Sequence, residues 1–111
     1  MNTIIIAGHL GSDPESRFIP NGTKVTTFNV ASNIRVNGQD VTMWYRVVIW
    51  GERFDKMMPH FKKGSAIVVS GELRRQDWTD KEGRQQVTLE IHADNVKFSP
   101  FGRPNAEQGA P

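Results

Sequence analysis

The sequence predicts an all-β fold with one short helix, and three observations support that prediction. Segments rich in Val, Ile and Thr recur along the 111 residues, several with apolar side chains at alternate positions. Asn-Gly pairs at 21–22 and 37–38 are typical of tight hairpin turns. A single segment, residues 52–64, has apolar residues at helical spacing. A chain of this length with 37% hydrophobic residues suits one domain with a modest core.

Three strands are expected before the helix, separated by turns: residues 2–10, 24–34 and 41–50, with a short extended piece at 15–19. In the helical segment, apolar side chains recur at spacings of three and four residues, and Gly64 ends the pattern. Pro59 disfavours helical geometry at Met58, so we expect a short helix with an irregular last turn.

Two further strands are expected after the helix, at 65–78 and 86–98, joined by a polar hairpin tip around Gly83. The last of them begins with apolar residues at every second position. After Pro100 the chain has neither periodicity nor enough apolar residues to pack. We therefore expect a domain over residues 1–100 and a flexible tail, the start of a linker, over 101–111.

The order of three strands, one helix and two strands favours a five-stranded Greek-key barrel of the OB type, with the helix between the third and fourth strands. An immunoglobulin-like sandwich would need more strands and no helix at that place. OB barrels bind oligonucleotides across the face of their second and third strands and along their loops. The fold class therefore directs the search for a site to the second and third strands, residues 24–34 and 41–50, and to the loops.

Composition and spacing exclude several classes of function. No cysteine is present, which excludes disulfides, thiol catalysis and thiolate zinc sites. His9, His60 and His92 lack metal-binding spacing, and the acidic residues are dispersed, so we expect no enzyme, metal or cofactor. The apolar runs are too short to cross a bilayer, which predicts a cytoplasmic protein. A net charge of +2 permits a polyanionic partner without requiring one.

The most informative segment is TMWYRVVIWGERF, residues 42–54. In an extended strand Trp44, Arg46 and Trp50 share one side, with Val48 among them, while Tyr45, Val47 and Ile49 point to the other. If Val47 and Ile49 line the barrel, the two indoles face outward. Trp78 lies beside the polar tip, where a core is hard to build. A lone Trp is more often a packing anchor, but three exposed indoles call for a stacking or packing partner.

Outward indoles beside cations suit unpaired nucleobases, because any base can stack on a flat ring and a cation can neutralise the adjacent phosphate. A duplex already hides its base faces, so single strands are favoured. Candidate phosphate-binding residues near this face or in the loops are Arg35, Arg46, Lys62, Lys63 and Arg74. Each one taken singly is as well explained as a solvated surface charge, and Lys62 and Lys63 also complement a helix dipole. Arg74 has the better claim over Arg75, since it shares strand parity with Trp78.

Several long motifs resemble, in the same order, those of bacterial single-stranded DNA-binding proteins: MNTIIIAGHLGSDPESRFIPNGTKVTTFNVAS, WYRVVIWG, KKGSAIVVSGELRRQDW and the TDKEGR tip. The resemblance covers nearly all of residues 1–100. It implies an OB fold assembled as a homotetramer, around which single-stranded DNA wraps. It also implies a nucleoid-associated role in DNA replication, recombination and repair.

By position, the resemblance implies stacking roles for Trp44, Trp50 and Trp78, and basic contacts for Arg46, Lys62, Lys63 and Arg74. Trp50 stands where the family usually has Phe, and Tyr45 stands at a position near a subunit interface that is a histidine in the best-known members.

This sequence also departs from the family. Arg35 replaces a further stacking Trp of the enterobacterial members, so that contact becomes electrostatic or is lost. Gln76, Asp77 and Thr3 replace expected basic residues, which implies weaker binding or binding that depends more on stacking than on charge.

The family continues into a linker and an acidic tip that recruits repair and replication enzymes. This chain stops at Pro111, so we expect such partners only if the natural chain has that tip. The alternative to DNA binding is an OB-type protein-interaction module, such as a primosomal protein, whose aromatics pack against protein.

Overall fold

The computed structural model describes residues 1–99, and the expected flexible tail at 101–111 lies outside them. Among the described residues, six strands account for most of the chain: β1 (Ile4–Leu10), β2 (Glu15–Phe18), β3 (Lys24–Val36), β4 (Gln39–Trp50), β5 (Ala66–Thr79) and β6 (Gln85–Phe98). The expected strands are all present, and the short extended piece forms β2. The Asn-Gly turn at 37–38 is confirmed, because Asn37 and Gly38 both have positive φ, at 50° and 79°. In the pair at 21–22, Gly22 has a positive φ of 91° and Asn21 does not.

The strands form one sheet in the order β1-β5-β6-β4-β3-β2, and β1 also pairs with β3. That last pairing closes β1, β5, β6, β4 and β3 into a five-stranded barrel and leaves β2 as an addition to β3. β4 and β6 are the parallel neighbours, and the other pairs are antiparallel. The predicted all-β, five-stranded OB-type barrel is confirmed.

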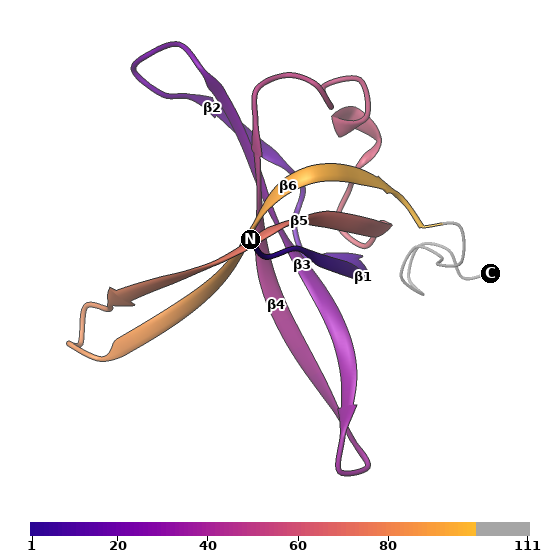
Figure 1. Cartoon of the computed structure of the whole chain (residues 1–111), viewed down its shortest axis with the longest axis vertical. Coiled ribbons are helices and arrows are strands. Elements are labelled where there is room, and N and C mark those ends of the chain that lie inside the picture. The colour runs from indigo at the N-terminus through magenta and orange to yellow at the C-terminus, as the bar shows by residue number, and fades with distance from the viewer. Residues whose placement is uncertain (100–111) are drawn as a thin grey trace.

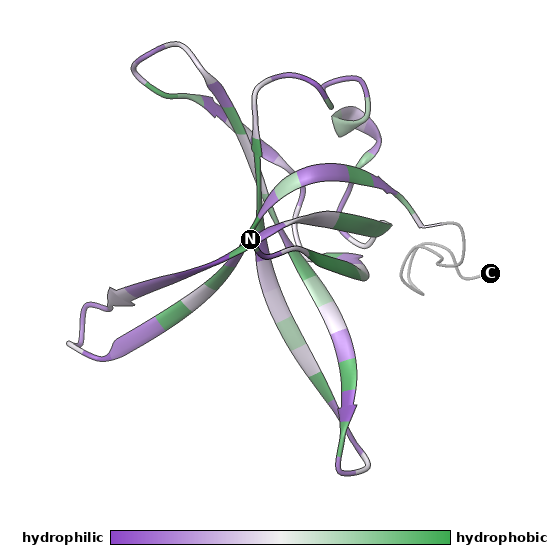
Figure 2. Ribbon diagram, in the orientation of Figure 1, coloured by the Kyte–Doolittle hydropathy of each residue, from purple (hydrophilic) through white to green (hydrophobic). Residues whose placement is uncertain are grey.

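Three hairpins extend from the barrel in different directions, formed by β2–β3, β3–β4 and β5–β6 (Figure 1). Alternation places one side of each strand inside the barrel. The residues buried there form a single core cluster together with Phe61, which follows η1: Ile6, Leu10, Phe28, Val30, Tyr45, Val47, Ile49, Phe61, Ile67, Val69, Ile91, Ala93 and Val96. The projecting half of β5 is hydrophilic along most of its length, as expected for a hairpin arm beyond the core (Figure 2).

The helix expected between the third and fourth strands is reduced to a 3-10 turn, η1 (Met58–His60). Pro59 has no amide hydrogen to donate, and turn hydrogen bonds of the i to i+3 type dominate the surrounding segment. Phe61 follows in an extended conformation and is buried. The apolar pattern of this segment therefore reflects how it packs on the barrel and does not indicate a regular helix. Phe54, Met57 and Met58 are partly buried against the core.

Candidate nucleic-acid interface

β4 presents two indoles on the outside of the barrel. Its inner residues Tyr45, Val47 and Ile49 are buried, whereas Trp44 and Trp50 are 56% and 45% exposed. The alternation expected from the sequence is therefore observed, with one exception. Val48 lies on the outer side but is only 6% exposed, in register between Thr27 of β3 and His92 of β6.

The register of the strands joins β4, β6 and β5 into one continuous outer face. Arg46 pairs with Glu90, which in turn pairs with Arg74. Residues directly opposite one another in neighbouring strands point to the same side of a sheet. We call this surface the outer face, and define it by these residues: Trp44, Arg46, Trp50, Glu72, Arg74, Trp78, Thr88, Glu90 and His92.

β6 lies in the middle of the outer face and orients two of the indoles. Trp78 donates its indole N–H to Oγ1 of Thr88 at 2.9 Å and is 48% exposed. Trp50 donates its indole N–H to Nδ1 of His92 at 3.0 Å. Each ring is thus fixed by its polar edge while much of its surface stays in contact with water. Trp44 is placed differently, with its ring packed against Gly11.

Each arginine of the outer face already has a carboxylate partner. Nε of Arg46 lies 4.0 Å from Glu90, and Nε of Arg74 donates to Glu72. The hydrogen bond and the charge of Arg74 hold the pKa of Glu72 below its ordinary value. The Arg74–Glu72 pair is exposed on both sides, and such pairs contribute little to stability, so an incoming phosphate can compete for that guanidinium group. The outer face is therefore less basic than its arginines alone would suggest.

The other predicted cations lie around this face. Lys63 and Trp44 line one surface hollow, and the backbone amide of Lys63 donates to Asp13. Lys62 is exposed in the same loop. Arg35 lies on the arm formed by β3 and β4, where it is paired with Asp40. The structure thus brings Lys63 close to an indole, while Arg35 lies further along the arm.

Tyr45 belongs to the barrel core and is 7% exposed. Its hydroxyl lies 3.8 Å from the sulfur of Met43. The role at a subunit interface stays a prediction, and this burial leaves little of the side chain for a partner to contact.

Sequence reasoning did not assign Thr88, Glu90 or His92 to the binding face, although they share strand parity; it considered His92 only as a metal ligand and Glu90 only as an acid–base group. Polar residues at every second position of a strand indicate only that this side of the strand faces water. Which residues of the neighbouring strands lie beside them is known only from the register of the sheet. Within residues 1–99 no group of three or more His, Asp or Glu side chains is arranged to hold a metal ion. No helix in that range is long and apolar enough to cross a membrane.

The fold and the outer face together define an OB-type barrel whose exposed sheet surface combines aromatic rings with arginines. Residues 1–99 match the family model described as "Single-strand binding protein family", and the chain belongs to that family. The resemblance inferred from the sequence motifs is thereby confirmed.

Individual relatives agree with this assignment. The chain is 43% identical over 97 residues to a single-stranded DNA-binding protein of Chlamydia pneumoniae, covering 87% of this chain and 61% of the relative. It is 40% identical over 96 residues to the single-stranded DNA-binding protein of Chlamydia caviae, covering 86% of this chain and 60% of the relative. It is 37% identical over 104 residues to single-stranded DNA-binding protein 1 of Xylella fastidiosa, covering 88% and 76%. The chain thus spans about 60% of the length of the chlamydial relatives it matches.

Proposed function

We propose that this protein binds single-stranded DNA without sequence preference, as a non-catalytic protein that protects and organises it in replication, recombination and repair. The observation that supports this proposal best is the position of three half-exposed indoles, Trp44, Trp50 and Trp78, on one outer face. The names and the family of its relatives point the same way.

The mechanism we infer is base stacking supported by charge. Each base that stacks on an indole contributes on the order of 1–3 kcal/mol, whichever base it is. Trp44 and Trp50 lie six positions apart on β4, which corresponds to about 20 Å of extended strand and so to several nucleotides. Arg46 and Arg74 lie between or beside the rings on the same face, where phosphates that link stacked bases would pass.

We further propose that the protein assembles as a homotetramer and acts at the nucleoid, where single-stranded DNA arises. The resemblance stated above supports this assembly, including an interface near Tyr45. Partner proteins of repair and replication would be recruited only if the natural chain has an acidic tip. Mass measurement in solution, with and without DNA, tests the tetramer.

The decisive test of binding is a titration with oligo-dT at low salt, followed by the indole fluorescence. We expect quenching, and a loss of affinity in Trp44→Ala and in Trp78→Ala. Sedimentation of both variants controls for their assembly. Intact assembly with lost affinity supports DNA binding, whereas unquenched emission and no binding would rule it out. If the aromatics instead packed against protein, the variants would lose assembly while the parent showed no affinity for oligo-dT.

A further inference from the structure

A chain of hydrogen bonds runs from an exposed ring of the outer face to a sheltered carboxylate. The indole N–H of Trp50 donates to Nδ1 of His92 at 3.0 Å, and Nε2 of His92 lies 3.0 Å from Oε1 of Glu90. Trp50 is 45% exposed, whereas the side chains of His92 and Glu90 are 12% and 15% exposed. The two groups behind the indole are thus largely withdrawn from water.

The donors and acceptors in this chain determine the protonation state that it requires. An indole nitrogen can only donate, so Nδ1 of His92 must accept and has no proton of its own. The single proton of the neutral ring is then on Nε2, which donates it to Glu90. An imidazolium has a proton on both nitrogens and cannot accept from Trp50. Neutral His92 satisfies both neighbours, and charged His92 satisfies only Glu90.

We infer from the hydrogen bond and the centroid distance that the two rings meet at their edges. Their planes differ by 22° and their centroids are 6.2 Å apart. The indole N–H and the lone pair of Nδ1 each lie in the plane of their own ring, so a direct hydrogen bond between nearly parallel rings puts them side by side. His92 therefore orients the indole through its polar edge and leaves the flat faces of Trp50 clear of its own ring.

Charged groups approach His92 from each neighbouring element. On β5, Glu72 is directly opposite in register, where a protonated His92 would help to lower the pKa of its carboxylate. The remaining charged groups around it are Arg46 on β4 and Arg74 on β5, each paired with one of the two glutamates, and the residues that line the adjoining hollow, Arg53, Asp94 and Met1. The two glutamates favour an imidazolium, while the Trp50 hydrogen bond requires the neutral ring. Protonation thus exchanges one interaction for the other.

We propose that His92 is a positioning residue for Trp50: in its neutral form it fixes the indole for stacking, and on protonation it releases that indole. The part of this inference that concerns stacking rests on the proposed function, while the part that concerns the indole does not.

The first experiment needs no DNA. In the full chain with Trp44→Phe and Trp78→Phe, Trp50 is the single remaining indole. We expect its fluorescence, and the NMR signal of its indole N–H, to change in one step as the pH is lowered from 8 to 5.5. His92→Asn should remove the step, because an amide oxygen near the place of Nδ1 accepts at every pH. His60→Gln, on η1, is the matched control and should keep the step. The proposal would be overturned if the step persisted in the His92→Asn variant, or if the single-tryptophan parent showed no step.

The second experiment compares two nearly isosteric variants of the three-tryptophan protein at pH 8. His92→Asn keeps an acceptor for Trp50 and should bind oligo-dT as the parent does. His92→Leu removes the acceptor and should bind about 2- to 10-fold more weakly, the equivalent of one hydrogen bond. Equal affinities of the Leu and Asn variants would contradict the inference. If the parent itself did not bind oligo-dT, the proposed function would fail, and the first experiment would still decide the role of His92.

Discussion

The ring of Trp44 lies directly against Gly11, where an added Cβ atom would be 2.5 Å from ring carbon Cζ3 and 2.8 Å from Cη2. These distances are too short for a carbon–carbon contact, so any larger residue at position 11 must displace the indole. Gly11 thus determines the position of the Trp44 ring. Trp44 is 56% exposed, so its ring can move without opening the core.

Gly11→Ala is therefore expected to weaken DNA binding while leaving the melting temperature nearly unchanged. The loss should not exceed that of Trp44→Ala, about 1–3 kcal/mol for one stacked base. Titration with oligo-dT measures both variants and their combination. In the double variant the two effects should not add, because both act through the same ring. Additive losses would mean that Gly11 acts independently of Trp44.

Arg74 and Arg75 provide a matched pair for the contribution of charge. Both are exposed on β5, and each forms an ion pair with a carboxylate two positions away in the sequence: Arg74 with Glu72, and Arg75 with Asp77. Alternation puts Arg74 on the outer face and Arg75 on the opposite side.

Arg74→Gln should reduce the slope of log K against log salt by about 0.7, the value for one phosphate contact on a single strand. Arg75→Gln should leave the slope as it is. Measurement of oligo-dT affinity at four or more salt concentrations gives both slopes. The same change in both variants would show that neither arginine is specific to the proposed DNA path.

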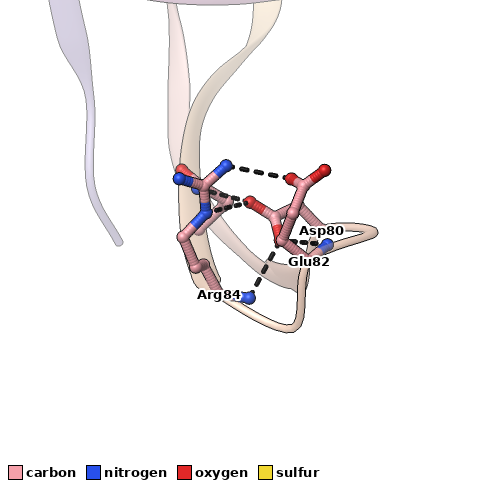
Figure 3. Close-up of polar contacts among 4 residues, drawn as sticks. Asp80, Glu82 and Arg84 are labelled. Atoms are coloured by element: carbon pink, nitrogen blue, oxygen red, sulfur yellow. Dashed lines mark hydrogen bonds and ion pairs between the residues drawn. The ribbon is translucent and has the colours of Figure 1, made fainter.

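Asp80 organises the tip of the β5–β6 hairpin (Figure 3). Its Oδ1 accepts from the backbone amides of Glu82 and Arg84, at 3.0 and 2.9 Å, and its Oδ2 accepts from Nε of Arg84 at 3.1 Å and Nε2 of Gln86 at 3.0 Å. These hydrogen bonds, that of the Arg84 amide foremost, lower the pKa of Asp80 from its ordinary value of 3.8.

Because the folded pKa is lowered, this stabilisation is present above pH 3.8 and is lost as the pH falls through the folded value. We expect the amide proton shifts of Glu82 and Arg84 to be constant from neutral pH down to about pH 4 and to change below it. Asp80→Ala should abolish the change, and Glu82→Gln should retain it. If the Asp80→Ala variant showed the same pH-dependent change in amide shifts as the parent, the change would belong to another carboxylate.

Phe61 anchors the irregular segment between β4 and β5 to the core. It is 2% exposed, and its ring meets those of Phe28 and Phe98 edge to face, with centroids 6.1 and 4.8 Å apart. Phe61→Ala should reduce the free energy of unfolding by about 3–5 kcal/mol. Urea unfolding measures it, with Phe18→Ala as the control, because Phe18 is 66% exposed and should change stability by no more than about 0.5 kcal/mol. Similar losses in both would contradict the anchoring role.

The predicted helix at 52–64 is where the local sequence pattern and the tertiary structure differ. Spacings of three and four between apolar residues describe which side chains meet one surface, and a chain of successive turns can satisfy them as well as a helix can. Pro59 was the sequence signal for the difference, since it cannot donate a backbone hydrogen bond. The barrel core then anchors the segment through Phe61, and this contact joins elements far apart in the sequence.

Sequence alone determined the succession of strands along the chain, the hairpin turns and the outward orientation of Trp44 and Trp50, because alternation and Asn-Gly chemistry act over a few residues. It also identified the family, through motifs that run the length of the domain. Only the tertiary structure decided that β6 lies between β4 and β5, that His92 and Thr88 bind the indoles, and that Glu90 and Glu72 neutralise the arginines. Those relationships depend on the register between strands that are distant in sequence, which no local pattern encodes.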